Sequence, residues 1–247
     1  MGEGSRPMGT VERAIAVLHT LAEAPGDLGN NEIARRTGVN ASTVSRLLAT
    51  LARDELVTRD ADTGRFRLGP RLVELGNAAL SRIDLRHLSR PHLEALTAMT
   101  GETATLSVPY REGTITIDFV QSPSSVRSVA QVGRSSVAHA TATGKIFLAY
   151  AGTMPADPLT AYTSRTITDR AELAGQVDQI RRRGWAQAVS ERETDLNAIA
   201  APVRRRDGVL VGVIGLQGPA GRFGPKVMRA AVDPLLEHCT EVSSAYR

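Results

Sequence analysis

Hydrophobic residues recur at helical spacing in three successive segments near the start of the chain. The segments are 10–24, 29–37 and 41–53, and each is followed or preceded by residues that break helices. The stripe of the first segment consists of Val11, Ile15, Leu18 and Leu21. Gly38, after the second segment, suits the left-handed turn that closes many helices. The pattern therefore predicts three short helices in succession.

The third helix and the residues after it have a more specific pattern. Asn40 or Ser42 is in position to cap this helix. Its apolar stripe consists of Val44, Leu47, Leu48 and Leu51. Two runs of strand-forming residues, 56–59 and 65–68, then enclose a polar turn, which is typical of a β-hairpin. The predicted order is helix, helix, turn, helix, hairpin.

The pattern changes beyond this hairpin. Residues 70–85 predict a further helix, which has the character of a connector. Strands are then expected near 103–109, 114–121, 126–131, 185–190, 198–205 and 209–217, and helices near 86–100, 139–150, 169–183 and 225–245. Antiparallel strands mixed with helices indicate the α+β class. We expect a first domain at 9–69, a linker helix at 70–85 and a second domain at 86–247.

The composition of the chain supports two domains and indicates the compartment in which the protein is expected. A chain of 247 residues is long enough for two domains of ordinary size. Its content of 42% hydrophobic and 23% charged residues is that of a globular protein, and no apolar run reaches the length of a membrane helix. The opening MGEGSRPMGT has no secretory apolar region, and Cys239 is the single cysteine. We therefore expect a cytoplasmic protein.

Positive charge is concentrated in one stretch of the first domain. The chain has a net charge of +4, and residues 35–71 hold eight arginines against four acidic residues. Residues 1–85 as a whole are neutral, with eleven basic and eleven acidic residues. The basic character is therefore a local patch, as expected of a protein that binds an anionic partner through one surface.

The outer face of the third helix has small hydroxyls and an arginine where surface helices usually have Glu and Lys. In a helix-turn-helix the second helix lies in the DNA major groove, where Ser and Thr contact phosphates or bases and Arg pairs with guanine. The alternative is a solvated helix in a small bundle, but the order of elements favours DNA binding. The candidate DNA-binding residues are Arg35, Ser42, Thr43, Ser45, Arg46 and, on the hairpin that would act as a wing, Arg65.

The second domain has two features that are compatible with a small-molecule pocket. The segment ATATGK (140–145) begins a helix, and free N–H groups at a helix start favour an anion. Small residues at a helix start also serve close packing against a sheet, so this feature alone leaves both readings open. The strands at 198–203 and 209–217 carry small side chains and a single polar Gln217, as expected of a mostly apolar cavity.

Four segments together resemble the IclR-type transcriptional regulators. They are NNEIARRTGVNASTVSRLLATLARDELV, LGPRLVELGNAAL, GRSSVAHATATGKIFLAY and GWAQAVSERETDLNAIAAPVRRRDGVLVGVIGLQGP. The resemblance begins near residue 9 and covers nearly the whole chain. It implies a winged helix-turn-helix followed by a GAF-like effector-binding domain, an antiparallel sheet flanked by helices. One departure is Glu55, where the family usually has Gly before the wing.

The resemblance also implies an effector site beside the helix at 140–150. By position, it would be formed by the backbone near Ala142 and Thr143 and by Ala188, Leu196, Ala198, Ala200, Gly215 and Gln217. Many members have Asp or Ser at the position of Ala188, and a Ser-x-Ser pair at Gly215 and Gln217. This chain therefore has less polar walls and almost no titratable groups in the implied site. We expect an effector larger or more apolar than pyruvate or glyoxylate.

An enzymatic alternative rests on a few polar residues of the second domain. Ser135, Ser136 and His139 lie close in sequence, and Glu191 could complete a hydrolase triad, although no G-x-S-x-G motif is present. Glu191 belongs to a charged run, and such runs usually lie on the solvated surface. A second interpretation places Glu191 beside the pocket. Zinc-site spacing is not found among the five histidines, which are His19, His87, His92, His139 and His238. Phosphate-loop and dinucleotide motifs are absent as well. We expect no enzyme activity, no metal and no cofactor.

The interpretation is a DNA-binding regulator, with repression as the direction that the resemblance implies. The regulator would act as a homodimer or a dimer of dimers on a palindromic operator, with the helix at 70–85 contributing to the dimer contact. A small organic effector, such as a carboxylate, would alter its affinity for the operator.

Overall fold

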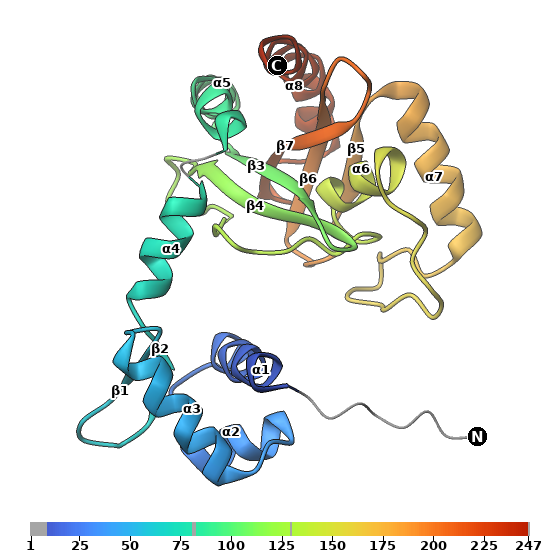
Figure 1. Ribbon diagram of the computed structural model, residues 1–247. Helices are drawn as coiled ribbons and strands as arrows, with labels where there is room; N and C mark the ends of the chain where they lie inside the picture. Colours follow the sequence, from blue (N-terminus) through green and yellow to red (C-terminus); the bar gives the residue numbers. More distant parts are fainter. Residues whose placement is uncertain (1–8, 81–82, 129, 247) are drawn as a thin grey trace. The chain divides into compact units, whose positions relative to one another are not determined.

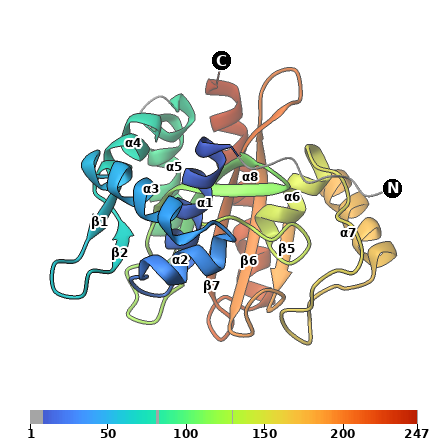
Figure 2. The same cartoon turned by 60° about the horizontal axis from the view of Figure 1, so that its bottom comes forward.

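The N-terminal unit is built around three short helices whose apolar faces meet. The computed structural model describes residues 9–80, 83–128 and 130–246, and the chain divides into two units, 1–82 and 83–247. The elements of the first unit are α1 (Thr10–Glu23), α2 (Asn30–Thr37), α3 (Ala41–Arg53), β1 (Val57–Arg59), β2 (Phe66–Leu68) and α4 (Arg71–Leu80). Helices α2 and α3 lie beside each other, and the β1–β2 hairpin follows α3 (Figure 2). This is the helix-turn-helix and wing that the sequence predicts.

The turn between α2 and α3 is fixed by two residues. Gly38 has a φ of 69°, the left-handed conformation that glycine adopts without steric cost. Asn40 is the N-cap of α3, and its side-chain oxygen accepts a hydrogen bond of 2.8 Å from the Thr43 N–H. Behind the turn, α3 buries the whole predicted stripe of Val44, Leu47, Leu48 and Leu51. The helix is therefore held from beneath, and its opposite side is exposed.

The stripe predicted for α1 is only partly buried. Leu21 lies in the core together with Val17, one helical turn earlier, whereas Val11 and Ile15 are exposed. Leu18 is half-buried against the same core, so the buried side includes the second half of the predicted stripe and is turned away from Val11 and Ile15. In the part of this unit that the structure describes, Val11 and Ile15 are exposed apolar side chains.

Glu55 occupies a backbone position that suits glycine better than a residue with a side chain. Its φ is 56°, so a residue with a Cβ is held in the left-handed region. We expect Glu55→Gly to raise the free energy of unfolding by about 1 kcal/mol, because relief of this strain outweighs the greater flexibility of glycine in the unfolded chain. Urea denaturation measures the change. Glu74→Gly in α4, a matched control without positive φ, should destabilise instead, and a loss of stability in Glu55→Gly would contradict the assignment.

The predicted linker helix is shorter than expected. The sequence pattern suggested one helix over 70–85, but α4 ends at Leu80 and the next helix begins at Asp84. Residues 81 and 82, which fell inside the predicted helix, lie outside the described residues. None of the residues of α4 is buried.

The second unit is a five-stranded antiparallel sheet between two pairs of helices. Its elements are α5 (Asp84–Thr100), β3 (Thr103–Tyr110), β4 (Gly113–Val120), α6 (Ala142–Tyr150), α7 (Arg170–Arg183), β5 (Ala186–Val189), β6 (Leu196–Arg204), β7 (Leu210–Pro219) and α8 (Pro225–Ala245). The strand order is β4-β3-β7-β6-β5. Helices α5 and α8 cover one face, and α6 and α7 cover the other (Figure 1). The α+β class predicted from the sequence is confirmed.

One predicted strand is wrong. Of residues 126–131, those that the structure describes form no strand. The backbone there bonds to side chains instead of to a neighbouring strand, since the Ser128 carbonyl accepts hydrogen bonds from the side chains of Thr103 and Gln121. Within the described residues, no helix has the length and apolar character required to cross a bilayer.

Candidate DNA-binding surface and effector pocket

The exposed side of α3 carries the polar residues predicted for DNA contact. Ser42, Ser45 and Arg46 are exposed, and Thr43 is half-buried. The Ser42 hydroxyl donates to the Asn40 side chain at 2.9 Å. Among the described residues, the side chains of Ser45 and Arg46 have neither a hydrogen-bond partner nor an ion pair. They are therefore free to contact a ligand.

The arginines of α2 differ in their engagement. Arg36 pairs with Glu32 one turn earlier, at 2.7 Å. Arg35 is exposed and has no partner among the residues that the structure describes. Of the two, Arg35 is the one that the structure leaves available, in agreement with its selection from the sequence.

The arginines of the hairpin differ in their engagement as well. Arg65 follows the turn and reaches back to α2, where its guanidinium lies 3.4 Å from Glu32. The turn itself is acidic, and hydrogen bonds from the Thr63 backbone and side chain lower the pKa of Asp60. Arg59, which the sequence reasoning missed, lies 5.9 Å from the Phe66 ring and has no acidic partner in the described chain. The wing therefore offers Arg59 more directly than Arg65.

The second unit has a cavity on the α6 face of its sheet. Its volume is about 90 Å³. Of the effector residues implied by the resemblance, those that line it are Ala142, Thr143, Ala188, Leu196, Ala198, Gly215 and Gln217. The strand residues come together because Ala188 pairs with Ala198, Ala198 with Gln217, and Gly215 with Thr105. All of these positions therefore lie on one face of the sheet, and Gly215 leaves space there because it has no side chain.

Ala200 is the exception among the implied residues. It projects from the same face as Ala198, but it does not line the cavity and is instead part of the buried core. Ala142, at the start of α6, belongs to the same core cluster, so the helix covers this part of the sheet. Alternation along a strand identifies the face of a residue, but it does not say where the covering helix begins.

The start of α6 presents backbone N–H groups to the cavity. The Thr141 hydroxyl caps the helix by accepting from the Gly144 N–H at 3.1 Å, and it donates to the Val137 carbonyl at 2.9 Å. The N–H groups of Ala142 and Thr143 have no hydrogen-bond acceptor among the described residues, and both residues line the cavity. Free N–H groups and the helix dipole favour an anion at this position.

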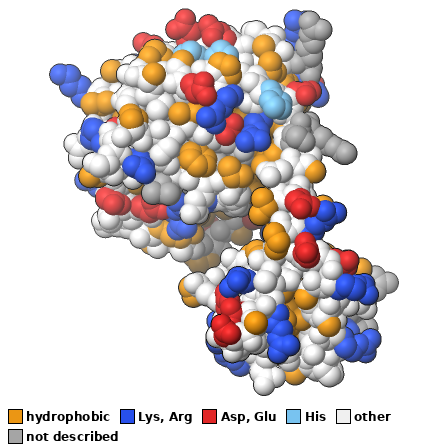
Figure 3. Space-filling view, turned by 90° about the vertical axis from the view of Figure 1, so that its left-hand side faces the viewer, with side chains coloured by type: hydrophobic (Ala, Val, Ile, Leu, Met, Phe, Trp, Pro, Cys, Tyr) orange, Lys and Arg blue, Asp and Glu red, His pale blue; other side chains and the backbone are white. Residues whose placement is uncertain are grey.

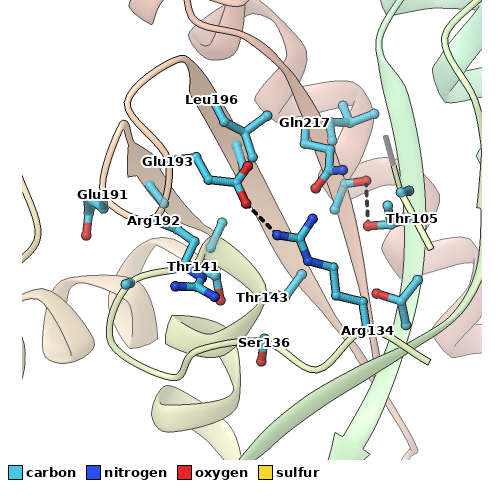
Figure 4. Close-up of a pocket in the computed structure, with 18 of the residues that line it drawn as sticks. Thr105, Arg134, Ser136, Thr141, Thr143, Glu191, Arg192, Glu193, Leu196 and Gln217 are labelled. Atoms are coloured by element: carbon cyan, nitrogen blue, oxygen red, sulfur yellow. Dashed lines mark hydrogen bonds and ion pairs between the residues drawn. The ribbon is translucent and has the colours of Figure 1, made fainter. Parts of the chain in front are cut away.

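Charged side chains lie around the cavity, contrary to the expectation of almost no titratable groups. Arg134 extends toward Glu193 and forms an ion pair with it (Figure 4). Arg192 also lines the cavity, and its guanidinium lies 4.1 Å from the ring of Tyr162. Sequence reasoning missed Arg134 because it lies in a loop and meets its partner across 59 positions of the chain.

A buried ion pair lies directly beside the cavity. Lys145 of α6 is fully buried, and its Nζ lies 2.6 Å from a carboxylate oxygen of Glu191, which also lines the cavity. The same ammonium donates to the Gln176 side chain at 2.9 Å and the Gln187 carbonyl at 3.2 Å. Burial lowers the pKa of Lys145, and the nearby Glu191 opposes that shift. Glu191 is therefore a buried neighbour of the pocket rather than solvated surface.

The polar groups considered for hydrolysis do not form a triad. His139 Nε2 lies 2.9 Å from the Thr160 carbonyl, and Ser136 Oγ accepts from the Thr114 N–H at 2.9 Å. Glu191 is engaged by Lys145. Ser136, His139 and Glu191 are thus bonded elsewhere, and no Ser–His–Glu relay links the candidate groups in the described structure.

Comparison with known proteins identifies the family of each unit. The IclR helix-turn-helix domain matches residues 10–61, and the bacterial transcriptional regulator IclR C-terminal domain matches residues 77–244. A glycerol operon regulatory protein from Streptomyces griseus is 32% identical over 90% of this chain and 89% of its own length.

Solved structures show the same fold. The crystal structure of an IclR transcriptional regulator from Silicibacter sp. TM1040 has a TM-score of 0.83 at 26% identity and covers 96% of both chains. An IclR homologue from Microbacterium hydrocarbonoxydans, complexed with 4-hydroxybenzoate, has a TM-score of 0.81 at 24% identity and covers 96% of this chain and 98% of its own. The Streptomyces relative is named as an operon regulatory protein. The chain therefore belongs to the IclR family of bacterial transcriptional regulators.

Proposed function

We propose that this regulator binds a two-fold symmetric operator as a homodimer, and that a small organic carboxylate in the second unit lowers its affinity for the operator. The observation that carries the DNA-binding part is the exposed side of α3, where Ser45 and Arg46 have no partner among the described residues. Repression is the direction that we expect from the family, and the cytoplasm is where such a protein would meet its DNA.

On DNA, the residues of the first unit would divide between two roles. Arg46 reads a base, because a guanidinium that is free of acidic partners can pair with guanine O6 and N7. Ser42, Thr43 and Ser45 contact phosphates or base edges, which suits their short hydroxyls. Arg35 of α2 and Arg59 or Arg65 of the wing contact the phosphate backbone, which positions the unit without reading sequence.

Dimerisation would use the apolar residues that the first unit leaves exposed. Val73 and Leu75 of α4 are 64% and 49% exposed, and α1 adds Val11 and Ile15. Hydrophobic side chains are visible along the segment that includes α4 (Figure 3). A second copy of this chain is the partner that we propose, because a symmetric dimer places two recognition helices about 34 Å apart, one turn of DNA.

Arg46→Ala is the variant that tests base reading. We expect its affinity for the cognate operator to fall by about 1–3 kcal/mol, roughly 5- to 150-fold, because one bidentate base contact is lost. Fluorescence anisotropy with labelled operator and with scrambled DNA measures both the affinity and the specificity. The control is Arg170→Ala, which removes the same charge from an exposed position at the start of α7. Equal operator affinity of the Arg46 variant and the control would reject the assignment.

The effector would be a monocarboxylate of about the size of benzoate. At roughly 10–15 Å³ per water-sized group, the cavity of about 90 Å³ has room for about six to nine non-hydrogen atoms. The free N–H groups of Ala142 and Thr143 are anion donors at one end, and the walls formed by Ala188, Ala198 and Leu196 are apolar. The complex of a homologous fold with 4-hydroxybenzoate supports this class.

Arg134 would recognise the carboxylate by exchanging partners. In the described structure it pairs with Glu193, and both side chains are partly exposed, so an incoming carboxylate could replace Glu193. Calorimetry with a panel of aliphatic and aromatic acids should identify a ligand. For that ligand we expect Arg134→Ala to weaken binding by about 10- to 150-fold, the value of a hydrogen bond to a charged group.

The variant Glu193→Gln separates recognition from simple loss of structure. It removes the competing carboxylate and keeps Arg134, so it should bind the acid more tightly than the unmodified protein. Arg170→Ala again serves as the control for lost charge. Binding of pyruvate or glyoxylate with no response to any larger acid would contradict the proposed size class.

A further inference from the structure

A cluster of possible metal ligands lies away from the effector pocket, on the opposite face of the sheet. Helices α5 and α8 pack against each other there, and they bring together His92 of α5 with His238 and Glu241 of α8. The two Nδ1 atoms are 2.8 Å apart. A carboxylate oxygen of Glu241 lies 3.4 Å from Nδ1 of His92 and 3.8 Å from Nδ1 of His238.

This triangle has the size that a tetrahedral metal ion requires. With metal–ligand bonds of about 2.0–2.1 Å, two ligand atoms in a tetrahedral site are about 3.3–3.4 Å apart. The three observed separations of 2.8, 3.4 and 3.8 Å bracket this value. A small rotation of the two imidazole rings would equalise them, and it would replace the hydrogen bond between the rings by two bonds to one ion.

The exposure of the cluster also suits a metal ion. Both histidines are half-buried and Glu241 is exposed. A cation can therefore reach the site from solvent, and a water molecule can complete its coordination.

We propose that His92, His238 and Glu241 bind a divalent transition cation that links α5 to α8, with Zn²⁺ as the ion that fits best. Two nitrogens and one carboxylate oxygen form a common ligand set for zinc. His238 and Glu241 are three residues apart and therefore on one side of α8. The bound ion would join the helix that begins the second unit to the helix that ends it.

Sequence spacing did not reveal this cluster, because His92 and His238 are 146 positions apart. Local motifs of the kind used to recognise zinc sites depend on ligands that are close in sequence. Here only the pair on α8 has such spacing, and the third ligand depends on how two distant helices pack.

Titration of the full chain with ZnCl₂ tests the proposal. After treatment with a chelator and buffer exchange, calorimetry should give one zinc ion per chain. His92→Gln and His238→Gln should each weaken zinc binding at least tenfold. The matched control is His87→Gln, an exposed histidine on α5, which should bind zinc as the unmodified protein does.

Two further measurements make the result decisive. Circular dichroism and thermal unfolding in chelator establish that the variants are folded, and added zinc should raise the melting temperature of the unmodified protein and of His87→Gln only. Replacement by Co²⁺ should give the visible absorption of a tetrahedral nitrogen and oxygen site, which His238→Gln abolishes. If folded variants bind zinc with unchanged affinity, or if the unmodified chain binds none stoichiometrically, the proposal is wrong.

Discussion

Lys145→Met should lower the free energy of unfolding of the second unit by about 3–5 kcal/mol, the cost of removing one partner of a buried ion pair. The side chain of Lys145 is 1% exposed, and its ammonium contacts Glu191, whose side chain is 9% exposed. Methionine fills a similar volume but leaves the Glu191 carboxylate buried without a counter-charge. It also removes the donor to Gln176 and to the Gln187 carbonyl.

The double variant Lys145→Met/Glu191→Gln isolates the uncompensated charge. It removes both charges, so we expect it to recover a large part of the lost stability, because a buried pair as a whole contributes much less than its disruption costs. Urea unfolding of both variants, monitored by circular dichroism, measures the difference. A single variant no less stable than the double variant would show that the carboxylate does not need Lys145.

Gly144→Ala should destabilise the second unit by about 3 kcal/mol, at the upper end of the usual range for overpacking. A Cβ on Gly144 would lie 2.5 Å from the Val137 carbonyl oxygen and 2.7 Å from the Ala138 Cα. Both contacts are with backbone, so no side-chain rotation relieves them. The start of α6 would have to move away from the preceding loop, and the N–H groups of Ala142 and Thr143 would leave their place in the cavity.

Gly175→Ala makes the same chemical change, but we expect it to have the opposite effect on stability. Gly175 lies inside α7, and a Cβ there would have no neighbour within 4 Å. Because alanine is the better helix former by about 1 kcal/mol, this control should be slightly more stable than the unmodified protein. Thermal unfolding of the two variants side by side checks the prediction. Similar melting temperatures for both would mean that the close approach at Gly144 is tolerated.

The sequence was sufficient for the features that local periodicity determines. The stripe on α3 and the hydroxyls opposite it could be predicted because both follow from helical spacing within one segment. The joint placement of Ala198 and Gln217 came instead from the family resemblance, and the pairing of their strands brings the two residues together. The cap at Asn40 and the turn at Gly38 followed from residue types with strong backbone preferences.

Features that depend on packing between distant segments could not be predicted in this way. Lys145 meets Glu191, and Arg134 meets Glu193, only after the sheet and its helices have assembled. The sequence contains one indication that Lys145 is unusual. It is one of only two lysines in an arginine-rich chain, and it lies within an apolar helix. Ala200 was assigned to the pocket by the family resemblance, but it lies in the core beneath α6, and the position of that helix depends on tertiary structure.

The proposed regulator requires coupling between effector binding in the pocket and operator binding by α3. The direct measurement is the dissociation constant of the operator complex, first without ligand and then with a saturating concentration of the carboxylic acid that calorimetry identifies. We expect the acid to weaken operator binding by about 5- to 150-fold, corresponding to a coupling free energy of about 1–3 kcal/mol. By linkage, operator DNA should weaken binding of the acid by the same factor. An operator affinity that stays the same at saturating acid would contradict the account.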